Sequence, residues 1–256
     1  MYSHSDYMIF VTLDDATQLS GIFGLISITI AWFYGLIVLY KFIKTREKML
    51  FYFFLAIIFT MSPWYPSGLG FIFWLFTRQE VAYQVYVLLG TIGTPIALYS
   101  WLQIYMPALH PEKKNLITII SICFSIIFYI YLFYFLFFAP GAPVSDIIGI
   151  KRSAIDIDYK GFILVFLAIS LLISIITGND FSIASMKVKE NPTIIWKGRF
   201  LIISFNLFAI GAIGDGFIQL NPVTLIIFRI FLMIASTTYY IGFILPKWMK
   251  RLLKLE

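Results

Sequence analysis

Seven long apolar runs constrain this chain more than any other feature of its sequence. A helix needs about 20 apolar residues to cross a hydrocarbon core roughly 30 Å thick. The runs that are long enough cover residues 19–40, 49–76, 82–106, 116–138, 161–178, 200–220 and 223–245. Only 12% of the residues are charged, against about 25% in an ordinary soluble domain. We therefore predict an all-α fold, a single integral membrane bundle of seven transmembrane helices surrounded by the lipid bilayer.

The distribution of Lys and Arg predicts how this bundle is oriented. Cytoplasmic loops of membrane proteins carry an excess of these residues. If the N-terminus lies outside, 14 of the 19 Lys and Arg residues face the cytoplasm and four face the outside. This bias accounts for the net charge of +6, and no nucleic-acid partner is predicted. Residues 1–17 contain no Lys or Arg, so we expect a retained first helix rather than a signal peptide, in a multi-pass protein of the cell membrane.

Two charged residues, Asp215 and Arg229, lie inside the last two apolar runs. Asp215 comes six residues before Asn221 and Arg229 eight residues after it, so both lie on the order of 10 Å below the outer end of an antiparallel helix pair. A lone charge at membrane depth is costly, which predicts that the two residues pair. The pair is either a ligand, proton or ion site or a structural clasp between helices.

The second apolar run is interrupted by two prolines and a glycine within residues 62–68. Residues 49–62 alone span about 21 Å, too short to cross, so the interruption must lie at membrane depth, in the outer third. Irregular backbone persists there only where it is buried in protein or lines a wet cavity. The interruption predicts either a polar pocket open to the outside or a kink packed by Trp64 and Tyr65.

The third and seventh runs add small and polar residues at helical spacing. The third contains Thr91 and Thr94 in a stretch with two glycines and a proline, which predicts a kink and close helix packing. The seventh places Ser236 on the same helix face as Arg229. Small residues of this kind are mostly packing residues in membrane helices. The candidate ligand-binding set is Asp215, Arg229, Trp64, Tyr65, Thr91, Thr94 and Ser236.

The loop of residues 139–160 is the longest outside the apolar runs. Its second half shows partial apolar and polar alternation, which predicts a short β-hairpin turning near residues 151–153. The hairpin is either a lid over the outer mouth of the bundle or a solvated connector.

Signatures of enzyme chemistry are poor. His4 and His110 lie far apart in end regions, so no histidine metal site or histidine-based triad is predicted. Asp215 follows a glycine as in intramembrane aspartyl proteases, but Asp180 is expected near the inner surface, too far away for a two-carboxylate mechanism. Every lysine lies in a loop or tail, which argues against a retinal Schiff base. We predict no catalytic residues, no metal and no cofactor.

The end of the last run reads Tyr239-Tyr-Ile-Gly-Phe-Ile-Leu-Pro-Lys-Trp-Met-Lys-Arg-Leu-Leu253, an apolar helix that leads into a basic exit segment. Together with the seven-helix layout, this resembles the N-terminal membrane sensor module of archaeal and bacterial histidine kinases. In those proteins the exit feeds a signalling helix and a cytoplasmic kinase domain. We expect no such domain to follow here, so the resemblance implies either a stand-alone module that acts through a separate partner or a sensor that has lost its output. Residues 247–256 are expected to be an amphipathic stub that anchors to the inner surface or docks that partner.

These observations favour a membrane sensor or receptor-like protein that binds a small ligand from the outer side and signals through a cytoplasmic partner. A small-molecule or ion transporter or channel is the first alternative, because an interrupted helix beside Asp215 could coordinate a substrate. A non-catalytic structural membrane subunit is the second alternative.

Overall fold

The computed structural model describes residues 12–139, 144–188, 190–217 and 222–255. Seven helical spans in these residues are long and apolar enough to cross a membrane. They comprise Asp15–Thr45, Lys48–Thr77, Tyr83–Leu109, Pro111–Phe138, Gly161–Met186, Pro192–Gly216 and Val223–Ile244. Each span contains one predicted apolar run or nearly all of it, although residues 218–220 of the sixth run lie outside the described residues. The predicted seven-helix membrane bundle is therefore confirmed, and the chain is a multi-pass membrane protein.

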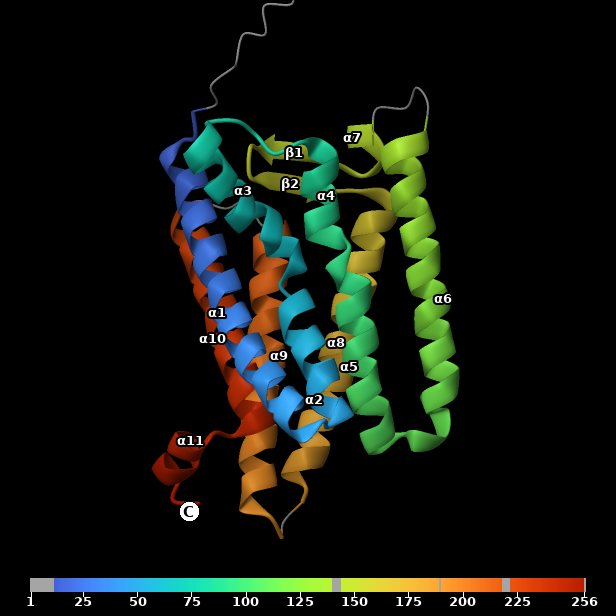
Figure 1. Ribbon diagram of the computed structural model, residues 1–256, viewed down its shortest axis with the longest axis vertical. Coiled ribbons are helices and arrows are strands. Elements are labelled where there is room, and N and C mark those ends of the chain that lie inside the picture. Colours follow the sequence, from blue (N-terminus) through green and yellow to red (C-terminus); the bar gives the residue numbers. More distant parts are fainter. Residues whose placement is uncertain (1–11, 140–143, 189, 218–221, 256) are drawn as a thin grey trace, which may run out of the picture.

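The spans stand side by side in one bundle (Figure 1). Helix α1 (Asp15–Thr45) packs against α10 (Pro222–Ile244), which pairs with α9 (Pro192–Phe217). Helix α9 packs in turn against α8 (Gly161–Met186). The fourth span consists of a short 3-10 turn at Pro111–Lys113, α6 (Lys114–Phe133) and a π-helical end at Tyr134–Phe138. Helix α6 lies at the edge of the bundle, where it contacts α5 and α8.

The second span is interrupted where the prolines predict. Helix α2 (Lys48–Phe59) ends before a 3-10 turn, Ser62–Trp64, and α3 (Tyr65–Thr77) follows it. Proline has no N–H group, so each proline removes a backbone hydrogen bond from the helix. The Tyr65 hydroxyl donates to the carbonyl of Ile58 at 2.7 Å and so provides a partner for a backbone group at the interruption.

The third span is also interrupted, between α4 (Tyr83–Thr91) and α5 (Gly93–Leu109). Pro95 removes one helical hydrogen bond here, and the Tyr129 hydroxyl donates to the Ile92 carbonyl at 2.8 Å. The hydroxyl groups of Ser62 and Thr94 are 3.3 Å apart. The two interruptions therefore meet inside the bundle.

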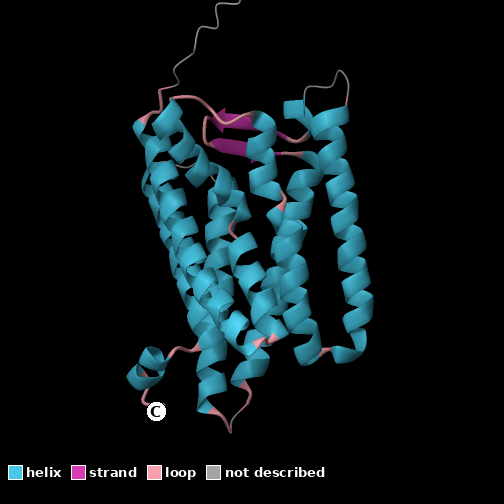
Figure 2. Cartoon of the chain, viewed as in Figure 1, coloured by secondary structure: helices cyan, strands magenta, loops and turns pink. Residues whose placement is uncertain are grey.

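A two-stranded antiparallel hairpin covers one end of the bundle (Figure 2). After the short helix α7 (Val144–Ile147), β1 (Gly149–Ser153) pairs with β2 (Asp156–Tyr159). The hairpin is predicted correctly, but its turn is at Ala154 and Ile155 rather than at residues 151–153. Both turn residues are buried against Phe71 and Trp74 of α3, and this contact holds the turn in place.

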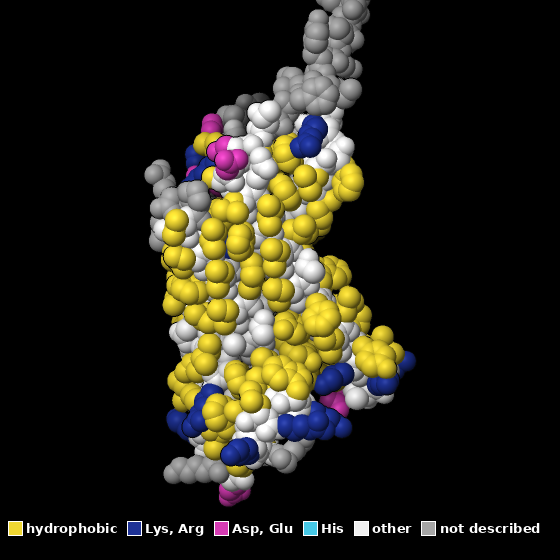
Figure 3. Space-filling view, turned by 90° about the vertical axis from the view of Figure 1, so that its left-hand side faces the viewer, with side chains coloured by type: hydrophobic (Ala, Val, Ile, Leu, Met, Phe, Trp, Pro, Cys, Tyr) yellow, Lys and Arg dark blue, Asp and Glu magenta, His cyan; other side chains and the backbone are white. Residues whose placement is uncertain are grey.

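On the face that Figure 3 shows, basic side chains gather at the end of the bundle opposite the hairpin, and apolar side chains cover the middle. The short helix α11 (Lys247–Leu252) lies beside the bundle at this basic end (Figure 1). Trp248 and Leu252 of α11 are exposed while Met249 is buried. Helix α11 therefore exposes apolar side chains next to the basic residues Lys250 and Arg251 of its last turn.

Candidate functional site

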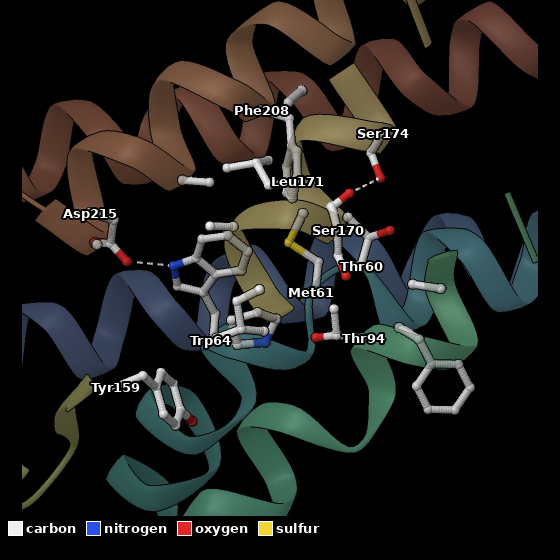
Figure 4. Close-up of a pocket in the computed structure, with 18 of the residues that line it drawn as sticks. Thr60, Met61, Trp64, Thr94, Tyr159, Ser170, Leu171, Ser174, Phe208 and Asp215 are labelled. Atoms are coloured by element: carbon white, nitrogen blue, oxygen red, sulfur yellow. Dashed lines mark hydrogen bonds between the residues drawn. The ribbon is translucent and has the colours of Figure 1, made fainter. Parts of the chain in front are cut away.

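A cavity of about 400 Å³ lies inside the bundle beneath the hairpin. Its walls come from α2, the interrupted second span, α5, α8, α9 and α10, and β2 closes part of one end. Figure 4 shows Trp64, Thr94, Ser174, Phe208 and Asp215 arranged around this space. The cavity therefore brings together segments that are more than 150 residues apart in the sequence.

Asp215 and Arg229 form the predicted ion pair at the wall of this cavity. Arg229 Nε lies 3.2 Å from Asp215 Oδ1, and the two side chains are 4% and 12% exposed. The indole N–H of Trp64 donates to Asp215 Oδ2 at 2.5 Å. The same carboxylate thus joins the interrupted second span to α9 and, through Arg229, to α10.

The hydrogen bonding of this pair is incomplete. Asp215 Oδ1, Arg229 Nε and Arg229 Nη1 are buried without a hydrogen-bond partner in the described part of the chain. The Nε–Oδ1 distance allows electrostatic attraction, but the N–H group is not directed at the oxygen. Arg229 Nη2 has one weak contact, 3.5 Å from the Ser20 hydroxyl. Because buried polar groups almost always have a partner, the pair retains hydrogen-bonding capacity that the described residues do not use.

The hairpin adds a second set of charges at its end of the cavity. Arg152, Asp156 and Asp158 line the cavity together with Tyr159. Arg152 forms an ion pair with Asp158. Burial raises the pKa of Asp156, and the nearby charge of Asp215 raises it further, while Arg152 and Arg229 oppose this effect. The hairpin is therefore part of the wall and contributes charge to it.

Hydroxyl groups line the middle of the cavity. The Ser204 hydroxyl donates to the carbonyl of Ala235 at 2.8 Å, and the Ser236 hydroxyl donates to the carbonyl of Leu232 at 3.0 Å. On α8, Ser174 donates to the carbonyl of Ser170, as Figure 4 shows, whereas the Ser170 hydroxyl itself has no partner among the described residues. The middle of the cavity is therefore mildly polar, and these hydroxyl-bearing side chains carry no charge.

Aromatic side chains close the far end of the cavity. The rings of Trp101 and Phe205 are 4.9 Å apart, and those of Phe205 and Tyr239 are 5.5 Å apart. The Trp101 indole N–H donates to the Thr177 hydroxyl at 2.7 Å. The cavity thus grades from charged at the hairpin end to aromatic at the far end.

Five of the seven predicted ligand-binding residues line this cavity, namely Asp215, Arg229, Trp64, Thr94 and Ser236. Tyr65 and Thr91 do not. The Tyr65 hydroxyl is used at the helix interruption, and the Thr91 hydroxyl donates to the carbonyl of Val87, one turn earlier in its own helix, at 2.7 Å. The structure therefore places both residues in the packing of their helices.

Sequence reasoning missed the contributions of β2 and α8. Asp156 and Asp158 alternate with apolar residues, which indicates that both face the same side of the strand. Ser170, Ser174 and Thr177 recur at the spacing of one helix face, a signal that could have indicated a polar wall in α8. Neither signal shows which cavity the residues line.

The arrangement can bind and orient a small molecule that has a polar end and an apolar body. Within residues 12–139, 144–188, 190–217 and 222–255, no group of three or more His, Cys, Asp or Glu side chains is arranged to hold a metal ion. Comparison of the chain with models of known protein families and with curated proteins finds no match.

Proposed function

We propose that this protein is a sensor or receptor-like protein of the cell membrane that binds a small amphipathic ligand in the cavity beneath the hairpin. The observation that carries the proposal is the buried ion pair of Asp215 and Arg229, which lies at the cavity wall with three polar atoms that lack hydrogen-bond partners among the described residues. A purely structural clasp would gain stability by directing these groups at each other.

The dimensions and lining of the cavity support ligand binding. Small-molecule sites are concave, mostly apolar and about 300–1,000 Å³ in volume, with a few converging polar groups. The cavity has a volume of about 400 Å³ and joins charged groups at one end to aromatic rings at the other. The excess of Lys and Arg at the opposite end of the bundle favours an outward-facing hairpin, so the ligand enters from the outer side.

The ion pair offers a route for signalling. Trp64 contacts Asp215, and Asp215 contacts Arg229 on α10. Helix α10 leads into α11, whose Trp248 and Leu252 are exposed at the basic end. A ligand that rearranges the ion pair would shift α10 against the second span, and α11 would present this change to a cytoplasmic partner. This route agrees with the resemblance to kinase sensor modules.

Extraction of bound small molecules tests the ligand site. We expect the protein purified in lipid nanodiscs to retain an amphipathic compound, detected by mass spectrometry, that a cavity-filling Ser174→Phe variant lacks. Ser185→Phe on the same helix is the matched control, because Ser185 does not line the cavity. Identical compounds in all three proteins would contradict the proposal.

Removal of residues 247–256 should abolish copurification of a partner while leaving membrane insertion intact, and unchanged recovery of the partner would favour a purely anchoring α11.

Transport is the second candidate function, because two interrupted spans meet at the cavity. Transporters commonly bind substrates where discontinuous helices meet near the middle of the membrane. Here Ser62 and Thr94, one from each interruption, have hydroxyl groups 3.3 Å apart. Flux of the retained compound across proteoliposomes would favour transport, whereas binding without flux would favour sensing.

A further inference from the structure

One carboxylate at the hairpin end of the cavity has no ion pair of its own. Five charged residues line this end, and two pairs are formed, Arg152 with Asp158 and Arg229 with Asp215. Asp156 is the fifth, and no salt bridge in the described part of the chain includes it. One of its oxygens, Oδ1, accepts the N–H of Ile157 at 3.0 Å. The hairpin end of the cavity therefore carries one uncompensated negative charge.

Aromatic rings lie at the same end as this carboxylate. Trp64, Tyr86 and Tyr159 line the cavity there, and Asp156 lies within electrostatic range of both tyrosines. Aromatic faces attract cations, most strongly where water is excluded. A carboxylate among aromatic rings is the arrangement that proteins use to hold ammonium groups.

A second observation also points to a ligand. Arg229 is 3% exposed and lines the cavity, and its Nη1 has no hydrogen-bond partner among the described residues. The Tyr159 hydroxyl also lacks a partner in the described part of the chain, but it lies against Gly90 of α4, a residue outside the cavity lining. Arg229 can donate to an oxygen. The cavity therefore has at this end a carboxylate without an ion pair and a donor without an acceptor among the described residues.

We propose that the cavity takes a ligand whose ammonium head group lies beside Asp156, whose adjacent oxygen accepts from Arg229, and whose apolar body extends between α2, α5, α8 and α9. This inference rests on the proposed function, because it identifies the chemical class of the ligand that the cavity binds. The apolar body fits the uncharged middle and the aromatic far end of the cavity, where Trp101, Phe205 and Tyr239 meet.

Three matched probes test the charge of the ligand without any variant. The cationic probe is 2-phenoxyethyl-trimethylammonium, and the neutral probe, 3,3-dimethylbutyl phenyl ether, replaces its nitrogen by carbon at the same shape. The anionic probe is 2-phenoxyethanesulfonate. In calorimetric titrations of the protein in nanodiscs, we expect the cation to bind about tenfold more tightly than its neutral counterpart, because a partly desolvated charge pair and cation–π contacts are gained. We expect the anion to bind most weakly.

Substitution of Asp156 then tests whether this carboxylate causes the preference for the cationic probe. Asp156→Asn should remove the advantage of the cation over the neutral probe while leaving the affinity for the neutral probe unchanged. Asp146→Asn is the matched control, because Asp146 is an exposed carboxylate on α7 outside the cavity, and it should retain the full preference.

The outcomes separate this inference from the proposed function. Equal binding of cation and neutral probe, tighter binding of the anion, or an unchanged preference in Asp156→Asn would overturn the ammonium class while leaving the cavity as a ligand site. Failure of all three probes to bind to folded protein would count against both. If Asp156→Asn does not fold, the comparison of the three probes on the wild-type protein still decides the charge.

Discussion

Removal of one charge from the Asp215–Arg229 pair should destabilise the bundle, and removal of both should restore much of the loss. The pair is buried on both sides, so a single substitution strands the remaining charge at membrane depth. We consider Asp215→Asn, Arg229→Gln and the double variant. Each substitution keeps the approximate shape of the side chain, so that the change in stability reports mainly on charge.

The structure sets the size of the effect. At the observed separation of 3.2 Å, an effective dielectric constant of about 20 gives an attraction of about 5 kcal/mol. Measured costs of breaking a buried pair are about 3–5 kcal/mol. Because the Arg229 N–H groups are not directed at Asp215 Oδ1, we expect a loss of about 3 kcal/mol, at the low end of this range.

The two single variants should differ from each other. Asp215→Asn strands a guanidinium that cannot lose its proton. Among the described residues, its remaining hydrogen-bond contact is the Ser20 hydroxyl, 3.5 Å from Nη2. Arg229→Gln strands a carboxylate that keeps its hydrogen bond from Trp64. Asp215→Asn should therefore be the more destabilising change.

Thermal unfolding of the four proteins in detergent provides the double-mutant cycle. Losses that simply add, with the double variant the least stable, would show that the residues do not pair and would refute the reasoning. The same proteins address function. A clasp predicts that the double variant recovers ligand binding along with stability, whereas a ligand site predicts a stable protein that no longer binds.

Three further predictions follow from particular residues. After replacement of the single cysteine, a membrane-impermeant reagent should label Ser153→Cys from outside the cell and Ser185→Cys only after permeabilisation; reversed labelling would invert the proposed orientation. Gly178→Ala should lower thermal stability by about 1–3 kcal/mol, because the added Cβ would lie 2.4 Å from a buried aromatic ring, while Gly216→Ala, which meets nothing within 4 Å, should not. The raised pKa of Asp156 means that the folded state binds the carboxyl proton more tightly than the unfolded state does. Ionisation of Asp156 therefore lowers the stability of the protein as pH rises through the pKa of the folded state. The melting temperature of Asp156→Asn should exceed that of the wild type at neutral pH, and this difference in melting temperature should narrow on acidification.

The sequence was sufficient for features that are encoded locally. Apolar runs mark the seven spans because the thickness of the membrane sets their length. Pro63 and Pro66 mark the interruption because neither can donate a helical hydrogen bond. The pairing of Asp215 with Arg229 follows from the cost of a lone buried charge and from their equal depth across a short turn.

Features that depend on distant packing could not be predicted in this way. The hydrogen bond from Trp64 to Asp215 joins residues 151 positions apart, and it depends on how the 3-10 turn directs the indole ring. The hairpin turn lies later than the alternation pattern suggests because Ile155 is buried against α3. Thr91 was a plausible ligand contact by residue type, but its hydroxyl is occupied by its own helix.

The interruption of the second span connects a feature that is encoded locally with contacts between distant segments. Within the three-residue turn Ser62–Trp64, the first residue contacts Thr94 at the interruption of the third span and the last donates to Asp215 on α9. Irregular backbone at membrane depth requires buried polar partners, and here the partners belong to the cavity wall. The same prolines that weaken the helix therefore favour the turn that places Ser62 and Trp64 in these polar contacts. A ligand that competes for either contact would act directly on the least regular point of the bundle, which is where a small binding energy can most easily move one helix against another.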